Sequence, residues 1–216
     1  MTPFPSSEIK NIIFDLGGVL LNINPLLSLL EFEKLSGIDK ETLTGRLAKE
    51  NVFEKFETGR LNPTQFRLEL NRIMETNLDN TAIDAAWNTL LLDFPLVRVQ
   101  LLQQLQKNYK VYLLSNTNII HFWHYTKEFF ENYNIQMIDL FDKLFLSYEI
   151  GLHKPDTSIY SYVIEDLGIE PSKTVFIDDS LANIESAAGL GINIIHITGE
   201  NDVTGYFVNG LLRAGG

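Results

Sequence analysis

The hydrophobic pattern of this chain changes character along its length. An apolar, β-prone run at 12–14 ends on Asp15 and is followed by Gly17 and Gly18, which predicts a buried strand and then a tight turn. From 25 to about 93 the apolar residues recur at spacings of three and four, with breaks near 36–37, 58–63 and 76–80. This spacing predicts four or five helices and no strand, with Trp87 in their core. The pattern therefore indicates a helical insertion placed directly after the first strand.

Beyond residue 95 the pattern alternates between strands and helices. Strands are predicted at 111–114, 143–146, 174–177 and 194–197, and helices at about 96–107, 121–133, 158–167 and 181–188. Such alternation is typical of a parallel sheet with helices on both faces. We therefore expect an α/β fold, a doubly wound parallel sheet. Its core domain comprises residues 1–23 and 94–216, and residues 24–93 form an inserted α-helical domain, here called the cap.

Polar side chains stand at the ends of three predicted strands. Asp15 follows the first strand, Ser115 follows the second, and Asp178 and Asp179 follow the fourth; Lys154 lies in a loop after another strand. Taken alone, Asp15 could simply cap a turn. Because parallel strands bring their carboxyl ends to one edge, where ligands bind in open α/β sheets, we expect all five side chains to converge on one site.

Composition narrows the range of partners. The 216-residue chain is 45% apolar and carries 17 basic against 28 acidic side chains, a formal charge of −11. Such an acidic chain is not steered to nucleic acid or to an anionic membrane surface. It has no cysteine, so thiol chemistry is excluded, and no apolar run suggests a signal peptide or a membrane span. The expectation is a cytoplasmic protein, a monomer or a homodimer, that binds a small molecule.

The predicted site has the groups needed for phosphoryl transfer. Three clustered carboxylates repel one another unless a cation lies among them, and an all-oxygen set of ligands suits Mg²⁺. Ser115, the backbone amides that follow it, and Lys154 would hold the oxygens of a transferring phosphoryl group. A carboxylate nucleophile can form an aspartyl-phosphate.

These motifs, in this order, resemble the haloacid dehalogenase superfamily over nearly the whole chain. The four matching segments are FDLGGVL from Phe14, LLSN from Leu113, HKPD around Lys154 and FIDDSLAN from Phe176. The insertion resembles the small helical cap of that superfamily. Within it, the chain is most similar to small sugar-phosphate phosphatases, including bacterial glucose-1-phosphate phosphatases.

The resemblance implies a role for each matching residue. Asp15 would attack phosphorus and also bind Mg²⁺, together with Asp179 and the main-chain carbonyl of Gly17. Ser115 and Lys154 would hold the phosphoryl oxygens, and Asp178 would orient the metal-binding groups or hold a metal-bound water. Substrate contacts are further expected at Gly17, Gly18 and Asn116. Asn183, four residues after Asp179, would hydrogen-bond to these acids.

One position departs from the pattern of the superfamily's phosphatases. These enzymes usually carry a second Asp two residues after the nucleophile as general acid and base, and here that position is Gly17. Such help is worth about 10²–10⁴-fold in rate. The enzyme would then be slow, or selective for good leaving groups, or supplied with an acid from elsewhere, for which Glu57 in the cap is one candidate. Arg60, beside it, would meet a sugar hydroxyl or a phosphate, or else form an ordinary surface pair with Glu57.

The sequence favours a Mg²⁺-dependent phosphomonoester hydrolase acting on a small phosphorylated metabolite, a sugar phosphate in the first instance. Two alternatives stay open. A 2-haloacid dehalogenase also lacks the second Asp, although the pair Asp178 and Asp179 is awkward around a metal-free haloacid. A catalytically weak protein that only binds a phosphometabolite would explain Gly17 but not the intact Asp15. Outside the site, His196 is interpreted as structural, and His153 as a substrate contact or a solvated loop residue.

Overall fold

The computed structural model describes residues 8–199 and 201–213, so the outermost parts of the predicted core domain, 1–7 and 214–216, lie outside the described residues. Five parallel strands form the central sheet in the order β3-β2-β1-β4-β5. They are β1 (Asn11–Phe14), β2 (Lys110–Ser115), β3 (Lys143–Leu146), β4 (Thr174–Asp178) and β5 (Asn193–His196). The predicted doubly wound parallel sheet is confirmed.

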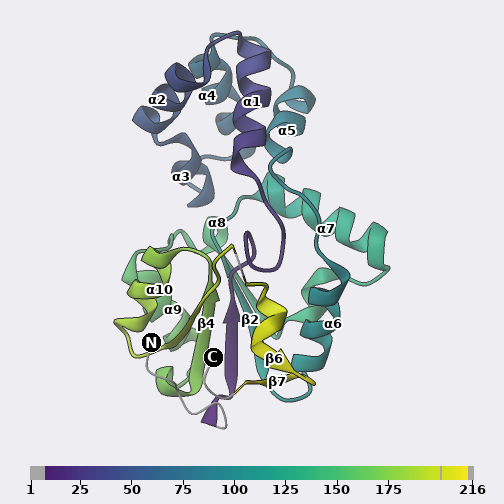
Figure 1. Ribbon diagram of the computed structural model, residues 1–216. Coiled ribbons are helices and arrows are strands. Elements are labelled where there is room, and N and C mark those ends of the chain that lie inside the picture. The colour runs from purple at the N-terminus through teal and green to yellow at the C-terminus, as the bar shows by residue number, and fades with distance from the viewer. Residues whose placement is uncertain (1–7, 200, 214–216) are drawn as a thin grey trace.

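Helices cover both faces of this sheet (Figure 1). They are α6 (Leu96–Leu105), α7 (Ile119–Tyr133), α9 (Thr157–Leu167) and α10 (Leu181–Ala188), while the short α8 (Ser147–Ile150) follows β3 on the side of the sheet that faces the cap. Single-turn 3₁₀ helices lie at Met137–Leu140, Pro171–Lys173 and Val203–Tyr206, and a small antiparallel pair, β6 (Phe207–Val208) and β7 (Leu211–Leu212), follows the sheet. None of the helices in the described ranges is both long and apolar enough to cross a membrane.

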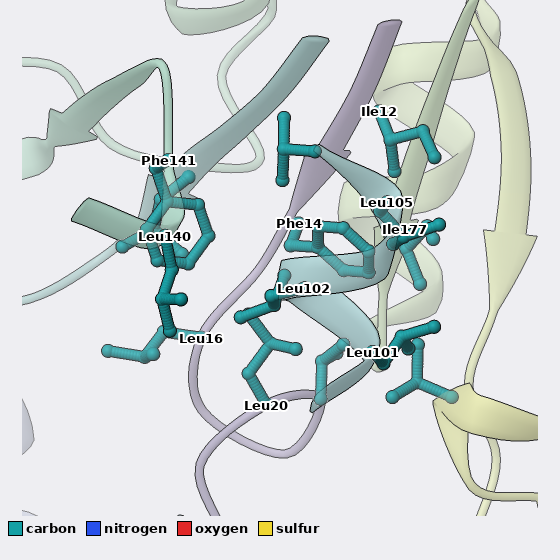
Figure 2. Close-up of a cluster of buried hydrophobic side chains, with 14 of the residues drawn as sticks. Ile12, Phe14, Leu16, Leu20, Leu101, Leu102, Leu105, Leu140, Phe141 and Ile177 are labelled. Atoms are coloured by element: carbon teal, nitrogen blue, oxygen red, sulfur yellow. The ribbon is translucent and has the colours of Figure 1, made fainter. Parts of the chain in front are cut away.

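Alternation along the strands builds two cores. Ile12 and Phe14 of β1 point to one face, which packs against α6, whereas Ile13 points to the other face, which packs against α9 and α10. In Figure 2, Phe14 lies beside Leu102 of α6 and Ile177 of β4. Because β1 is buried on both faces, its end is held rigidly in the middle of the sheet.

The insertion consists of helices only. Residues 24–93 form α1 (Pro25–Ser36), α2 (Lys40–Glu50), α3 (Val52–Glu57), α4 (Pro63–Met74) and α5 (Asn80–Asn88), which gather at one end of the sheet (Figure 1). Local signals set their ends: Asn62 and Gln65 form a capping box on α4, and Gly37 ends α1 in the left-handed conformation. The cap has its own buried cluster, which includes Trp87 as predicted and is joined by Ile120 of α7.

The two chain segments that enter and leave the cap run side by side. The amide of Leu92 donates to the Asn22 carbonyl, and the amide of Asn24 donates to the Leu90 carbonyl, at 2.9 and 2.8 Å. This ladder lies at the expected limits of the cap, 23–24 and 93–94, although the domain division itself stays a prediction.

Candidate active site

The site lies where the middle strands of the sheet end. Asp15 directly follows β1, and the neighbouring strands β2 and β4 end on Ser115 and Asp178. All three side chains are buried, with exposed fractions of 7%, 3% and 0%. The structure thus brings together the strand-end residues that the sequence placed on one edge.

Lys154 joins the ends of three strands, β1, β2 and β4. Its Nζ donates to Asp15 Oδ1 at 2.5 Å, to Asp178 Oδ2 at 2.7 Å and to the carbonyl of Leu114 at 2.9 Å. Although burial works to lower the pKa of this ammonium, Asp15 and Asp178 outweigh that effect and hold the pKa above its usual value. Lys154 is therefore a fixed positive charge.

Asn116 positions this lysine. Its Oδ1 accepts from the backbone amide of Lys154, and its Nδ2 donates to the Lys154 carbonyl, both at 2.9 Å. The end of β2 is thereby tied to the loop that carries Lys154. The side-chain amide of Asn116 thus holds the loop, and the substrate contact expected for this residue stays a prediction.

Three carboxylates lie close enough to share a cation. Asp15, Asp178 and Asp179 each present an oxygen atom, and these atoms lie within 4.8 Å of one another. Burial, opposed by Lys154 and reinforced by Asp178, raises the pKa of Asp15 from 3.8 to about 7. Burial and the Asp178 charge also raise the pKa of Asp179. Such mutual destabilisation is relieved by a bound cation, and the all-oxygen donor set fits Mg²⁺.

The backbone at Gly18 leaves room for the side chain of Asp179. Gly18 has a φ of +79°, and a Cβ at this position would lie 2.3 Å from Asp179 Oδ2, so only glycine fits. Asn183 orients the neighbouring acid, because its Nδ2 lies 3.0 Å from both carboxylate oxygens of Asp178. This contact was predicted from the sequence.

Glu57 approaches the core from the cap, at the end of α3. Its Oε2 lies 3.0 Å from His153 Nε2, while His153 Nδ1 lies 3.2 Å from Asn116 Nδ2. Since the Asn116 amide can only donate, Nδ1 accepts, and the neutral ring donates from Nε2 to Glu57. His153 is thus a half-buried link between cap and core. The sequence could have suggested this only through its position next to Lys154.

The side chain of Arg60, three residues after Glu57, pairs with other residues of the cap. Its guanidinium donates to Glu54 at 2.5 Å and to Thr58 at 2.8 Å, and more than half of its side chain is exposed. The alternative of a surface pair with Glu57 is therefore wrong in its partner. Arg60 lines a separate hollow beside the His153 loop, and a role in substrate binding stays a prediction.

A cavity of about 460 Å³ opens between the cap and the sheet edge. Gly17, Ser115 and Asn116 line its end at the sheet, and Glu57 lines it from the cap. The site therefore combines a buried carboxylate, a fixed ammonium, an acid cluster and an enclosed space beside them. That combination suits displacement at an anionic centre.

Comparison with known proteins agrees with this arrangement. A family model for haloacid dehalogenase-like hydrolases matches residues 9–191. A D-ribitol-5-phosphate phosphatase from Bacteroides thetaiotaomicron is 34% identical over 184 residues, 85% of this chain and 89% of that protein. A sesquiterpene phosphatase from Aspergillus oryzae is 28% identical over 192 residues, 88% of this chain and 90% of that protein.

A solved structure is similar over the same extent. It is a haloacid dehalogenase family enzyme from Bacteroides thetaiotaomicron in complex with magnesium and inorganic phosphate. It has a TM-score of 0.85 and 37% identity, covering 93% of this chain and 100% of that one. The chain belongs to the haloacid dehalogenase-like hydrolases, as its four motifs predicted, and the two relatives described above are named as phosphatases.

Proposed function

We propose that this protein is a Mg²⁺-dependent hydrolase of small phosphomonoesters that works through an aspartyl-phosphate on Asp15. The observation that carries the proposal is the position of Lys154, which is bonded at once to Asp15 and to Asp178 inside the acid cluster. A buried cation at this place offsets the charge of the nucleophile while a dianionic substrate approaches. The magnesium and phosphate bound by the solved relative support the same chemistry.

Each residue has a defined part in the reaction. A carboxylate oxygen of Asp15 forms a bond to phosphorus as the bond to the ester oxygen breaks, and Ser115 and Lys154 hold the non-bridging oxygens. Water then attacks the same phosphorus, which frees phosphate and regenerates Asp15. Asp15, Asp179 and the carbonyl of Gly17 would hold Mg²⁺, which supplies further positive charge to the phosphoryl group.

The leaving oxygen needs a proton that Gly17 cannot give. We assign this role to Glu57, which lines the cavity and is hydrogen-bonded to His153. The contact with His153 ties Glu57 to the loop of Lys154, so the acid is presented on the same side as the phosphoryl-binding groups. Cap closure over the site would couple substrate binding to correct placement of this acid.

Two related activities are less well supported. A metal-free dehalogenase has no use for three carboxylates within 4.8 Å of one another. A protein that only binds has no need of a carboxylate held by Lys154. Among phosphatases, one relative is named for a polyol phosphate and another for a sesquiterpene phosphate, so the sugar phosphate expected from the sequence is one of several candidate substrates.

The test compares p-nitrophenyl phosphate and glucose 1-phosphate with Mg²⁺ or with EDTA, in the wild type and in Asp15→Asn. We expect turnover of the nitrophenyl ester that needs Mg²⁺ and is lost in Asp15→Asn, because its leaving group departs without a proton. Turnover of 2-chloropropionate, with none of either phosphate ester, would instead support the dehalogenase.

A further inference from the structure

The cavity beside the nucleophile has an apolar interior. Leu16 and Leu21 line it from the core, and Leu29, Phe32 and Leu47 line it from the cap. Its volume of about 460 Å³ is within the range of pockets that enclose small organic ligands. Since Ser115 and Gly17 belong to the same cavity, a phosphoryl group at Asp15 would direct the rest of its ester into this apolar space.

An aromatic stack forms part of the wall. The rings of Phe53 and Trp87 lie 4.6 Å apart and nearly parallel, and the Trp87 ring lies 4.4 Å from that of His121. Burial lowers the pKa of His121 to about 3, so the imidazole is neutral. Its Nδ1 lies 3.1 Å from Asn118 Nδ2, and its Nε2 lies 3.3 Å from the Trp87 carbonyl. Both ring nitrogens are thus occupied, and His121 offers the cavity an uncharged ring.

Two further polar side chains of the wall, Ser28 and Glu57, already have partners. Ser28 Oγ donates to the Trp87 carbonyl at 2.7 Å and accepts from the amide of Leu90 at 3.2 Å. Glu57 bonds to His153 through Oε2, and the proposed function assigns the carboxyl to the leaving oxygen of the ester, so it is not free for a further hydroxyl. A polyol chain would therefore bury several hydroxyls with few free partners, and each unpaired hydroxyl lowers affinity by roughly five- to a hundredfold.

Two buried polar groups of the wall have no partner. Trp87 and Tyr125 are 5% and 4% exposed and line the cavity, and within the described part of the chain the indole Nε1 and the phenol oxygen have no hydrogen-bond partner. Buried polar groups without a partner are unusual in a folded protein. One or two oxygens on an otherwise apolar ligand would satisfy them, whereas two such groups do not serve the several hydroxyls of a sugar.

We propose that the substrate is the phosphate monoester of an apolar alcohol, whose hydrocarbon part fills this cavity and which carries at most one or two further oxygens. The inference rests on the proposed phosphatase activity and specifies its substrate class. The phosphate end is recognised by Ser115 and Lys154. Selectivity for the alcohol then comes from burial of hydrocarbon between Leu29, Phe53 and the sheet edge.

Pentyl phosphate and ribitol 5-phosphate form a matched pair for the test. Both are primary phosphates on a five-carbon chain, so their leaving groups are alike and only the hydroxyls differ. We expect a higher kcat/KM for pentyl phosphate, rising from butyl to octyl phosphate by about fourfold for each added methylene until the cavity is full. A higher kcat/KM for ribitol 5-phosphate, or no dependence on chain length, overturns the inference but leaves the phosphatase activity standing. Failure to hydrolyse any ester, p-nitrophenyl phosphate included, overturns both.

Two leucines of the cap provide a variant and its control. Leu29→Asn places an amide in the wall of the cavity, whereas Leu68→Asn makes the same change on α4 at a side chain that is 64% exposed. The first should lower the ratio of kcat/KM for pentyl over ribitol phosphate by at least several-fold, and the second should leave it unchanged. A folded Leu29→Asn variant that keeps the wild-type ratio contradicts the proposal.

Discussion

Asp15→Asn should inactivate the enzyme and, without metal, make the fold more stable. Asp15 is 7% exposed, and burial raises its pKa from 3.8 to about 7 despite the nearby Lys154. Each unit of pKa shift corresponds to about 1.4 kcal/mol, so keeping this carboxylate ionised in the folded state costs up to roughly 4 kcal/mol. Asparagine occupies the same space without the charge. Lys154 keeps its contact with Asp178 at 2.7 Å in either case.

The sign of the pH dependence follows from the direction of the shift. Because the pKa of Asp15 is higher in the folded state, the folded protein binds the proton of Asp15 more tightly than the unfolded chain does. The resulting contribution to the free energy of unfolding is fully present below pH 3.8 and is lost as the pH rises towards about 7. Relative to the wild type, Asp15→Asn should therefore gain stability across this window and be about 2–4 kcal/mol more stable at pH 8 in EDTA.

The difference in the free energy of unfolding between the wild type and Asp15→Asn is measured by urea unfolding, at several pH values in EDTA and again in Mg²⁺. Bound Mg²⁺ should stabilise the wild type more than the variant and so reduce the difference. Asp142→Asn is the control, because here the substitution should lower the free energy of unfolding at pH 8 instead of raising it. Partial burial opposes the shift, but hydrogen bonds from Lys110 and from the amide of Val111 hold the pKa of Asp142 below its usual value. An Asp15→Asn variant no more stable than the wild type at pH 8 in EDTA, or a difference that does not change with pH, would show that the buried charge of Asp15 does not destabilise the fold.

Three further substitutions test separate parts of the site. Asn183→Ala removes both contacts to Asp178 and should lower activity by about 10–100-fold and raise the Mg²⁺ concentration needed for half-maximal activity; an unchanged Mg²⁺ response would contradict this role. Glu57→Gln should slow glucose 1-phosphate by about 10²–10⁴-fold and change its pH profile, yet affect p-nitrophenyl phosphate little; equal effects on both esters would exclude Glu57 as the acid. Gly17→Asp restores the missing carboxyl, and its Cβ would lie 2.9 Å from the movable end of Ile23. Combined with Glu57→Gln, this substitution should restore the rate of glucose 1-phosphate hydrolysis. A double variant as slow as Glu57→Gln would mean that the proton comes from elsewhere.

The parts of the fold that depend on local pattern were predictable from the sequence. The runs at 12–14, 111–114, 143–146 and 174–177 all lie within the observed strands, because buried parallel strands are continuous apolar segments. The last strand begins and ends one residue earlier than predicted, at Asn193–His196, and the small β6–β7 pair was missed because strands of two residues carry no periodic signal.

The site likewise has residues that could be placed from the sequence and contacts that could not. Asp15, Ser115 and Asp178 could be placed from sequence, because the ends of adjacent parallel strands must meet. The bond between Glu57 and His153 could not, since it spans the cap and the core and depends on how those two parts pack. The pairing of Arg60 with Glu54 rather than Glu57 was likewise decided by the course of one turn. The apolar wall of the cavity could not be predicted from the sequence, because its leucines and aromatic residues have the same helical spacing as the residues of the cap core.

Covalent catalysis by Asp15 is tested most directly by an acid-quenched single turnover with p-nitrophenyl phosphate and Mg²⁺, followed by peptide mass analysis. We expect a transient phosphoryl adduct on the peptide that contains Asp15, formed before phosphate is released and absent in Asp15→Asn. Release of phosphate with no adduct at any time, at a rate that Asp15→Asn retains, would show that Asp15 is not the nucleophile.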